Sequence, residues 1–270
     1  MNKVRILYIT QEIKPYTDFT EMADYMRELV LNSNTKSNEL RILMPKFGTI
    51  NERRHKLHEV VRLSGMNIII DDDDFPLIIK VASLPESRIQ VYFLDNDEFF
   101  KKRLPFADEN NVPFEDNDSR AIFFCKGGIE TVKKFGWPPY IIHVGGWMSS
   151  LVPLFIRKVY QDDPVYNHSK IVYTPFINDL KLDFKGNFKQ KVLINDMTPE
   201  DLTDYVDKDG NVDLNFGAIK NSDAVMLPFE EGMEQYIEFA ENNNIPFYIH
   251  KQEDKKYKGE TEFYHSLLED

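Results

Sequence analysis

The alternation of buried strand-like runs with a helical segment at the start of the chain constrains the fold most strongly. Val4–Thr10 is an apolar run of strand length, and Leu40–Met44 is a second one that stops at Pro45. Between them, Phe19–Leu31 carries apolar side chains at helical spacing on one face. Two buried strands joined by a helix favour a right-handed parallel crossover. The sequence therefore predicts an α/β fold with a Rossmann-like, doubly wound and mostly parallel sheet.

The segment at about residues 55–85 consists of short strand-like runs broken by turn residues, which predicts an antiparallel β meander inserted into the sheet. Its strand-like runs are Leu57–Leu63, Met66–Ile70 and Leu77–Val81, and the acidic stretch Asp71–Asp74 is expected to be a solvated turn. Further on, the same alternation of strands and helices resumes. The expected elements are Gln90–Leu94, Asn96–Arg103, Asn117–Phe135, Tyr140–Val144, Trp147–Tyr160, Lys170–Thr174, Ala224–Leu227, Glu230–Asn243, Pro246–Ile249 and Glu260–Leu268.

Residues at about 180–213 are helical, polar and charged, and they are expected to form a surface lobe. We find no internal repeat, low-complexity tract or Gly/Ser linker, so residues 1–270 are expected to form a single domain.

Composition narrows the classes of partner. The chain has 270 residues, 42% of them hydrophobic, and a formal net charge of −12. So acidic a surface repels nucleic acid and anionic lipid, and neither is expected as a partner. The one cysteine, Cys125, cannot form an internal disulfide. Together with the absence of a leader-like or membrane-spanning segment, this predicts a reducing, cytoplasmic location.

Ligands of open α/β sheets bind beyond the carboxyl ends of the strands. The segment from His143 to Ser149 is the sharpest candidate, because Gly145 and Gly146 separate a strand end from the following segment and let a ligand approach the backbone. Ser149 offers a hydroxyl to such a ligand. The alternative is a tight turn in which His143 is hydrogen-bonded in place and Trp147 belongs to the core.

Asp95 and Asn96 follow another strand, and Asp116 and Asn117 open a long helix. Asp95 and Asn96 are candidates for binding a sugar, and Asp116 and Asn117 either bind sugar hydroxyls or cap the helix. Lys126-Gly127-Gly128 lies inside a helical pattern and lacks the order of a phosphate loop, so close packing is favoured. Zinc, EF-hand and serine-hydrolase signatures are missing, and the sequence predicts neither a metal site nor a cofactor.

Several segments in order resemble the glycogen/starch synthases of glycosyltransferase family five. They are Lys3–Thr10 with Glu12 and Pro15, Met44-Pro45-Lys46-Phe47-Gly48, Val91–Asn96, Asp116-Asn117-x-x-Arg120 with Phe123-Phe124, Trp137-x-Pro139-x-Ile141-Ile142-His143, and Trp147 with Leu151. The resemblance runs from residue 3 to about residue 176. It implies a fold corresponding to the N-terminal, acceptor-side half of a two-domain glycosyltransferase of the GT-B type.

The departures from this family bear on activity. Its K-T-G-G-L loop, which contacts the sugar-nucleotide diphosphate, aligns with Asp18-Phe19-Thr20-Glu21-Met22. Two carboxylates beside a diphosphate are repulsive, and the glycines that allow a close approach are gone. The candidate residues of this degenerate donor loop are Asp18, Thr20 and Glu21. Gly146 and Met148 stand where the family has Asp and His, and the family's second domain has no counterpart in the sequence.

These features predict a non-catalytic protein of glycogen metabolism that binds α-glucan or another carbohydrate, or that regulates or scaffolds a partner. The alternative is a glycosyltransferase, using ADP- or UDP-glucose, that is active only when another chain supplies the donor half. A purely structural or homo-oligomerising module is a further alternative.

Overall fold

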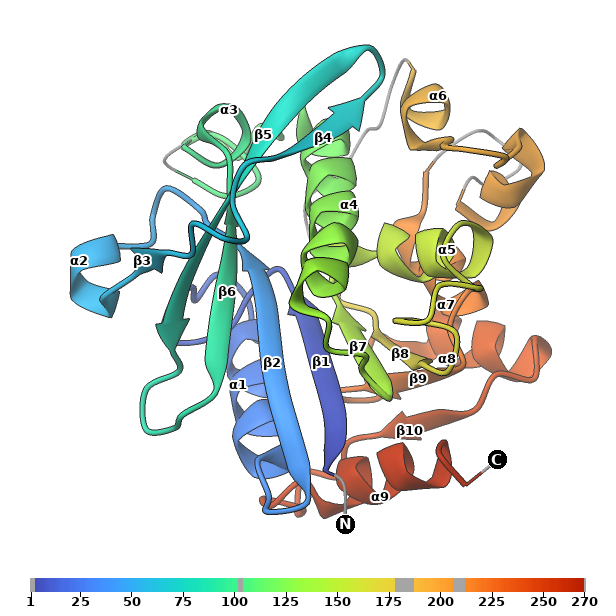
Figure 1. Ribbon diagram of the computed structural model, residues 1–270. Coiled ribbons are helices and arrows are strands. Elements are labelled where there is room, and N and C mark those ends of the chain that lie inside the picture. Colours follow the sequence, from blue (N-terminus) through green and yellow to red (C-terminus); the bar gives the residue numbers. More distant parts are fainter. Residues whose placement is uncertain (1–2, 102–103, 178–186, 206–211, 270) are drawn as a thin grey trace.

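The structure, a computed structural model, describes residues 3–101, 104–177, 187–205 and 212–269. Within these residues the strands form a ten-stranded sheet in the order β10-β9-β8-β7-β1-β2-β6-β5-β3, with β4 paired to β5 (Figure 1). The strands are β1 (Val4–Thr10), β2 (Asn38–Pro45), β3 (His58–Glu59), β4 (Met66–Ile70), β5 (Asp73–Ser83), β6 (Gln90–Asp95), β7 (Ile141–Gly145), β8 (Lys170–Thr174), β9 (Ala224–Leu227) and β10 (Phe247–Ile249).

The helices flank this sheet. They are α1 (Met22–Ser33), α2 (Glu52–His55), α3 (Asp97–Phe100), α4 (Asn117–Phe135), α5 (Leu151–Lys158), α6 (Phe188–Val192), α7 (Leu214–Lys220), α8 (Glu234–Asn242) and α9 (Lys258–Ser266), with 3-10 helices η1 (Trp147–Ser149) and η2 (Pro199–Tyr205).

The pairing confirms the predicted mostly parallel, doubly wound sheet. β1 lies at its centre and pairs in parallel with both β2 and β7. From β1 the chain builds the sheet outward through β2 and β6, and then returns to the other side of β1 for β7, β8, β9 and β10. The strand order therefore reverses at β1 and β7. In open α/β sheets such a reversal is where ligands bind, at the carboxyl ends of the strands.

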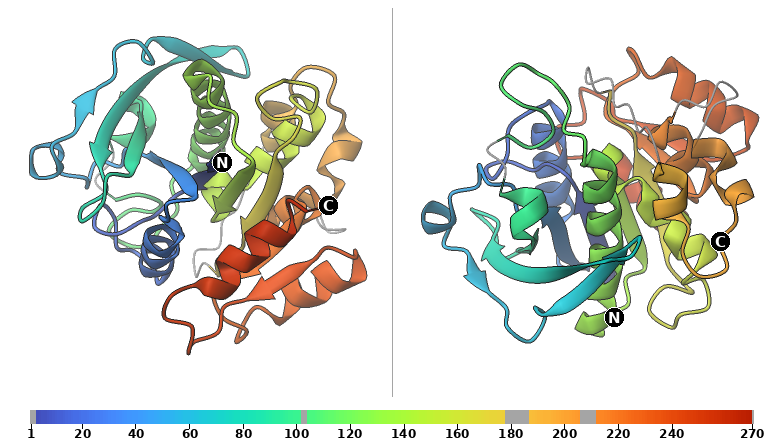
Figure 2. Two further views of the ribbon diagram at one scale, coloured as in Figure 1. Left: turned by 60° about the horizontal axis from the view of Figure 1, so that its bottom comes forward. Right: turned by 90° about the horizontal axis from the view of Figure 1, so that it is seen from above.

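Helices cover both faces of the sheet, which explains the continuous apolar runs in its central strands. α4 and α5 lie over one face, while α1 and α9 pack together over the other (Figure 2). The four side chains from Ile6 to Ile9 in β1 are at most 1% exposed. Gly127 in α4 lies against the sheet, where a Cβ would be 3.2 Å from the Leu94 side chain. Burial of this apolar surface is the main force that holds the layers together.

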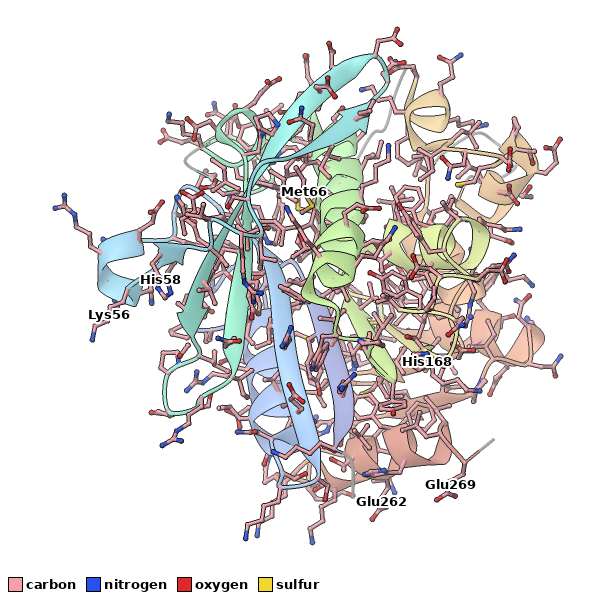
Figure 3. All side chains as sticks on the ribbon, in the orientation of Figure 1. Lys56, His58, Met66, His168, Glu262 and Glu269 are labelled. Atoms are coloured by element: carbon pink, nitrogen blue, oxygen red, sulfur yellow. The ribbon has the colours of Figure 1, made fainter. Side chains whose placement is uncertain are left out.

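The inserted antiparallel segment differs from its prediction in detail. β4 and β5 form a hairpin in which Ile69 and Ile70 pair with Asp74 and Asp73, so the acidic stretch is only partly a turn. The strand predicted over Leu57–Leu63 is wrong beyond β3, which spans two residues. The hairpin leans over α4, and the Met66 side chain at its base lies beside that helix (Figure 3).

The predicted surface lobe falls partly within the described residues. There it contains α6 and η2, which agree with the helical pattern. The parts of the prediction over residues 180–186 and 206–211 lie outside the described residues. No helix in the described part of the chain is long and apolar enough to span a membrane.

Candidate functional site at the carboxyl edge of the sheet

A cavity of about 580 Å³ opens at the carboxyl edge of the parallel strands. Its walls come from the segment after β1, the segment after α3, and the loops after β8 and β9. The side chains that define its character are Phe19, Thr20, Glu21, Phe106, Phe176 and Phe229. Aromatic walls with a few polar groups are typical of small-molecule sites, because apolar surface supplies affinity and polar groups fix orientation.

Phe106 is the centre of the aromatic wall. Its ring lies edge-on to Phe47 at a centroid distance of 5.4 Å, to Trp147 at 5.3 Å and to Phe19 at 6.1 Å. Its backbone carbonyl accepts a hydrogen bond of 2.8 Å from Asn117 Nδ2. Residues from three separate motifs of the sequence therefore support one cavity wall, since Phe47, Asn117 and Trp147 all contact Phe106.

Asn117 is itself held by a buried cation. Arg120 Nη1 donates to Asn117 Oδ1 at 2.9 Å, and Arg120 Nε donates to the Phe99 carbonyl at 2.7 Å. Arg120 is fully buried, and burial lowers its pKa to about 10. The beginning of α4 thus anchors the segment that carries Phe106.

The loop after β1 is organised by Glu12. This carboxylate is 0% exposed and accepts hydrogen bonds from the amides of Phe19 and Thr20, both at 3.0 Å, and from the Thr20 hydroxyl at 3.1 Å. Burial raises the Glu12 pKa, and the three donated hydrogen bonds oppose that shift. Two backbone N–H groups of the degenerate donor loop are therefore already paired inside the protein and are not directed at a ligand.

The rim of the cavity is acidic. Glu21 is exposed and lines both the cavity and an adjoining hollow with Glu230 and Glu231. Asp18 is partly neutralised by Lys14, whose Nζ lies 3.1 Å from Asp18 and 2.6 Å from Asp24. Negative charge at this rim repels a second anion, so it disfavours a diphosphate.

Two further candidate residues serve the turn between β7 and η1. Ser149 Oγ donates to the carbonyls of Gly145 and Gly146, at 2.6 and 2.9 Å. Gly146 has φ 85° and ψ 162°, a conformation that is nearly restricted to glycine. Gln11 fills the space beside it and accepts a hydrogen bond of 3.0 Å from the Met148 amide. Direct contact of Gly145, Gly146 or Ser149 with a ligand stays a prediction.

His143 lies away from the cavity, between the sheet and α9. Its Nδ1 is hydrogen-bonded to the Tyr264 hydroxyl at 2.6 Å, and its Nε2 to Thr174 Oγ1 at 2.8 Å. The ring is completely buried, and this burial lowers its pKa to about 3. His143 is therefore a neutral, doubly hydrogen-bonded side chain of the core, as the alternative interpretation of the sequence described.

The remaining candidates form local structure. Asp95 pairs with Lys80 at 2.8 Å, and Lys80 also contacts Glu52. The Asn96 side chain accepts from the amides of Glu98 and Phe99 and so caps α3. Asp116 immediately precedes α4, where its side chain makes no capping hydrogen bond.

The structure brings Thr20 and Glu21 to the cavity and places Trp147 and Asn117 directly behind it. Phe176 and Phe229 follow strands within two residues, in the segments where ligands of open α/β sheets are expected. Phe106 was not predicted as a site residue, because it lies in the apolar stretch Leu104-Pro105-Phe106-Ala107 and belongs to no motif. No three His, Cys, Asp or Glu side chains gather as metal ligands within the described ranges.

The fold is that of an α/β protein of the kind that forms one half of a GT-B glycosyltransferase, with a cavity at the carboxyl edge of its sheet. The comparisons specify the family. A family model described as the starch synthase catalytic domain matches residues 5–228, and the chain belongs to this family.

Curated relatives include a protein named glycogen synthase from Chlorobaculum tepidum, 34% identical over 88% of this chain and 48% of the relative. A glycogen synthase from Chlorobium phaeobacteroides is 38% identical over 63% of this chain and 35% of the relative. The chain thus spans about half the length of such relatives or less.

Among solved structures, the catalytic domain of starch synthase IV from Arabidopsis thaliana, bound to ADP and acarbose, aligns with a TM-score of 0.71. The alignment covers 98% of this chain and 50% of that one, at 16% sequence identity. At 16% identity, this alignment shows that the two proteins share a fold.

Proposed function

We propose that the chain binds α-glucan in the carboxyl-edge cavity and acts as a non-catalytic glucan-binding, regulatory or scaffold protein of glycogen metabolism. One observation carries the non-catalytic part of this proposal. The loop after β1 presents acids at the rim, and Glu12 occupies the Phe19 and Thr20 amides, so these two N–H groups are not available to a diphosphate. A transferase needs such contacts, because negative charge grows on the leaving group.

The glucan part of the proposal rests on the cavity walls. Phe19 and Phe106 present apolar ring surface, while Thr20 and Asn111 add polar groups at the border. Sugar rings have apolar faces as well as hydroxyls, and such a lining suits both. The structural relative in complex with acarbose and ADP supports a carbohydrate ligand in this fold. A cytoplasmic location, in which Cys125 stays reduced, belongs to the same proposal.

The test is calorimetric titration of the purified chain with maltoheptaose and, separately, with ADP. We expect binding of maltoheptaose and none of ADP. Phe19→Ala should weaken maltoheptaose binding by about fivefold, because it removes an aromatic wall that contributes about 1 kcal/mol. Tyr140→Ala is the matched control: Phe19 is 39% exposed and Tyr140 38%, but Tyr140 adjoins the opposite end of the strands.

Tight ADP binding by the chain alone would contradict the proposal, and so would equal effects of the two substitutions.

A second candidate function is favoured by the relatives, which carry the name glycogen synthase. It is glucosyl transfer completed by another chain that carries a donor-binding half. This alternative predicts labelled glycogen from ADP-glucose only in the presence of that chain. Transfer by the purified protein on its own would overturn the non-catalytic proposal.

A further inference from the structure

A second hollow, of about 530 Å³, lies between the β4–β5 hairpin, α4 and the segment around α6. We call it the α4 groove and define it by Asn67, Ile69, Lys126, Tyr160, Lys191 and Asn195. It shares no residue with the carboxyl-edge cavity, and neither the family resemblance nor the proposed function assigns it a role.

Lys126 projects from α4 into this groove. Its Nζ donates one hydrogen bond of 2.6 Å, to the carbonyl oxygen of Ile69 in the hairpin. Within the described part of the chain, Lys126 forms no ion pair, although the protein as a whole is strongly acidic. An ammonium group has three N–H donors, and here one carbonyl is the partner that the fold provides.

The charged neighbours of Lys126 are each engaged elsewhere. Lys191 pairs with Asp118 at 2.8 Å. Glu130 accepts a hydrogen bond of 2.7 Å from the Tyr160 hydroxyl and lies 3.6 Å from Lys133.

On the hairpin side, Asp71 accepts a hydrogen bond of 3.1 Å from Asn187 Nδ2. Burial lowers the pKa of the Lys126 amine to about 8. Much of the Lys126 population is neutral just above neutral pH, whereas an ordinary lysine is almost entirely charged.

We propose that Lys126 is a site of N-acylation, with an acyl phosphate as the class of acyl donor. The neutral amine attacks the acyl carbon, an N–C bond forms, and the C–O bond to phosphate breaks. Phosphate leaves with the electron pair and takes up the proton that the amine loses. No oxidant, reductant or further reactant is needed.

The product suits the site better than the ammonium does. An acylated lysine keeps one N–H, which is the donor that the Ile69 carbonyl requires. It loses a charge that no carboxylate within the described residues balances, and the groove is far larger than a two-carbon acyl group. Acylation of Lys191 would instead break its ion pair with Asp118.

The experiment exposes the full chain to acetyl phosphate over a range of pH and quantifies acetylation at each lysine by mass spectrometry of peptides. Lys191 is the matched control, because it lines the same groove but is ion-paired. Lys134, which is exposed on the same helix, reports the behaviour of an ordinary lysine.

We expect Lys126 to react about tenfold faster than Lys134 near pH 7.5. A larger fraction of the Lys126 amine is neutral, but an amine with a lower pKa is a weaker nucleophile, so the two effects partly cancel. The Lys126 rate should level off above about pH 8. In urea the difference should vanish. A Lys126 rate no greater than that of Lys134 or Lys191, or an advantage that persists in urea, would overturn the proposal.

A second measurement is independent of reagent access. Lys126→Gln mimics the acylated side chain, and we expect its melting temperature to equal or exceed that of the unmodified protein. Lys191→Gln should lower the melting temperature, since it leaves Asp118 without its cation. If both variants lose the same stability, Lys126 has a charge partner and the proposal is wrong.

Discussion

Phe106 illustrates how single side chains organise the carboxyl-edge cavity. It belongs to no recognisable motif, yet Phe47, Asn117 and Trp147 all contact it. The motif residues nearest the cavity therefore lie behind its surface and hold Phe106, which forms the wall, in place. A side chain in this position contributes to binding through the geometry of another residue.

Asn117→Ala tests this support. The substitution leaves the Phe106 carbonyl and Arg120 Nη1 without their partner, so it should destabilise the protein by about 1–3 kcal/mol. It should also weaken maltoheptaose binding, because the Phe106 wall loosens. Denaturant unfolding and calorimetric titration measure the two effects.

Asn96→Ala is the control for Asn117→Ala. Both asparagines are 3% exposed and both are hydrogen-bonded near the start of a helix, but Asn96 caps α3 and donates to the Pro76 carbonyl. We expect a comparable loss of stability with unchanged glucan affinity. Equal losses of affinity in both variants would show that Asn117 acts on stability alone.

At the scale of elements, the turn between β7 and η1 is the most constrained connection of the site. Gly146 combines a backbone conformation nearly restricted to glycine with close contact to Gln11, whose side chain holds the Met148 amide. Gly145 is adjacent, but a Cβ there would meet the end of the flexible Met22 side chain at 2.9 Å. A side chain at position 146 should therefore be less well tolerated than one at position 145.

Gly146→Ala should destabilise the protein by about 1–3 kcal/mol from backbone strain, and by more if Gln11 is displaced. Gly145→Ala should have a smaller effect, because Met22 can shift. Denaturant midpoints of the two variants provide the comparison. A larger loss for Gly145→Ala would contradict this account of the turn.

The elements also show why part of the structure was predictable. Both ends of α4 were predicted, because a polar pair opens the helix and Gly136 closes it with φ 58°. β1, β8 and β9 match their apolar runs. The start of β5 was missed because Asp73 and Asp74 are exposed on a hairpin, where the ladder needs only the backbone.

The site was less predictable than the fold, for a related reason. The motif residues Asn117 and Trp147 lie directly behind the cavity, but their partner Phe106 lies in a loop whose position depends on tertiary contacts. His143 had the sequence context of a ligand-binding residue, and only the packing of α9 shows that Tyr264 engages it. The sequence pattern within one segment does not show which distant segment packs against it.

At the scale of the whole molecule, burial of His143 couples stability to pH. The unfolded chain binds a proton on this ring below about pH 6.5, whereas the folded protein does not until about pH 3. The contribution of neutral His143 to the free energy of unfolding is therefore fully present above the pKa of the unfolded state. It decreases as the pH falls from that value toward the pKa of the folded state. Tyr8, Tyr264 and, more distantly, Glu260 are the titratable groups around it.

His143→Gln should remove this dependence. We expect the free energy of unfolding of the unmodified protein, relative to the variant, to fall by about 1.4 kcal/mol per pH unit below about pH 6. His168→Gln is the control, because His168 is an exposed side chain (Figure 3). Urea unfolding at several pH values measures the slopes, and parallel curves for the protein and His143→Gln would refute the coupling.

The cavity at the carboxyl edge has walls that lie far apart in the sequence. Phe19 precedes α1, Phe106 precedes α4, and Phe229 follows β9. The last of these walls is in place only when β9 pairs with β8, because Phe229 lies two residues beyond the end of β9. The glucan binding that we propose for this cavity therefore requires the assembled sheet, and a protein in which β9 has come away from β8 should not bind maltoheptaose.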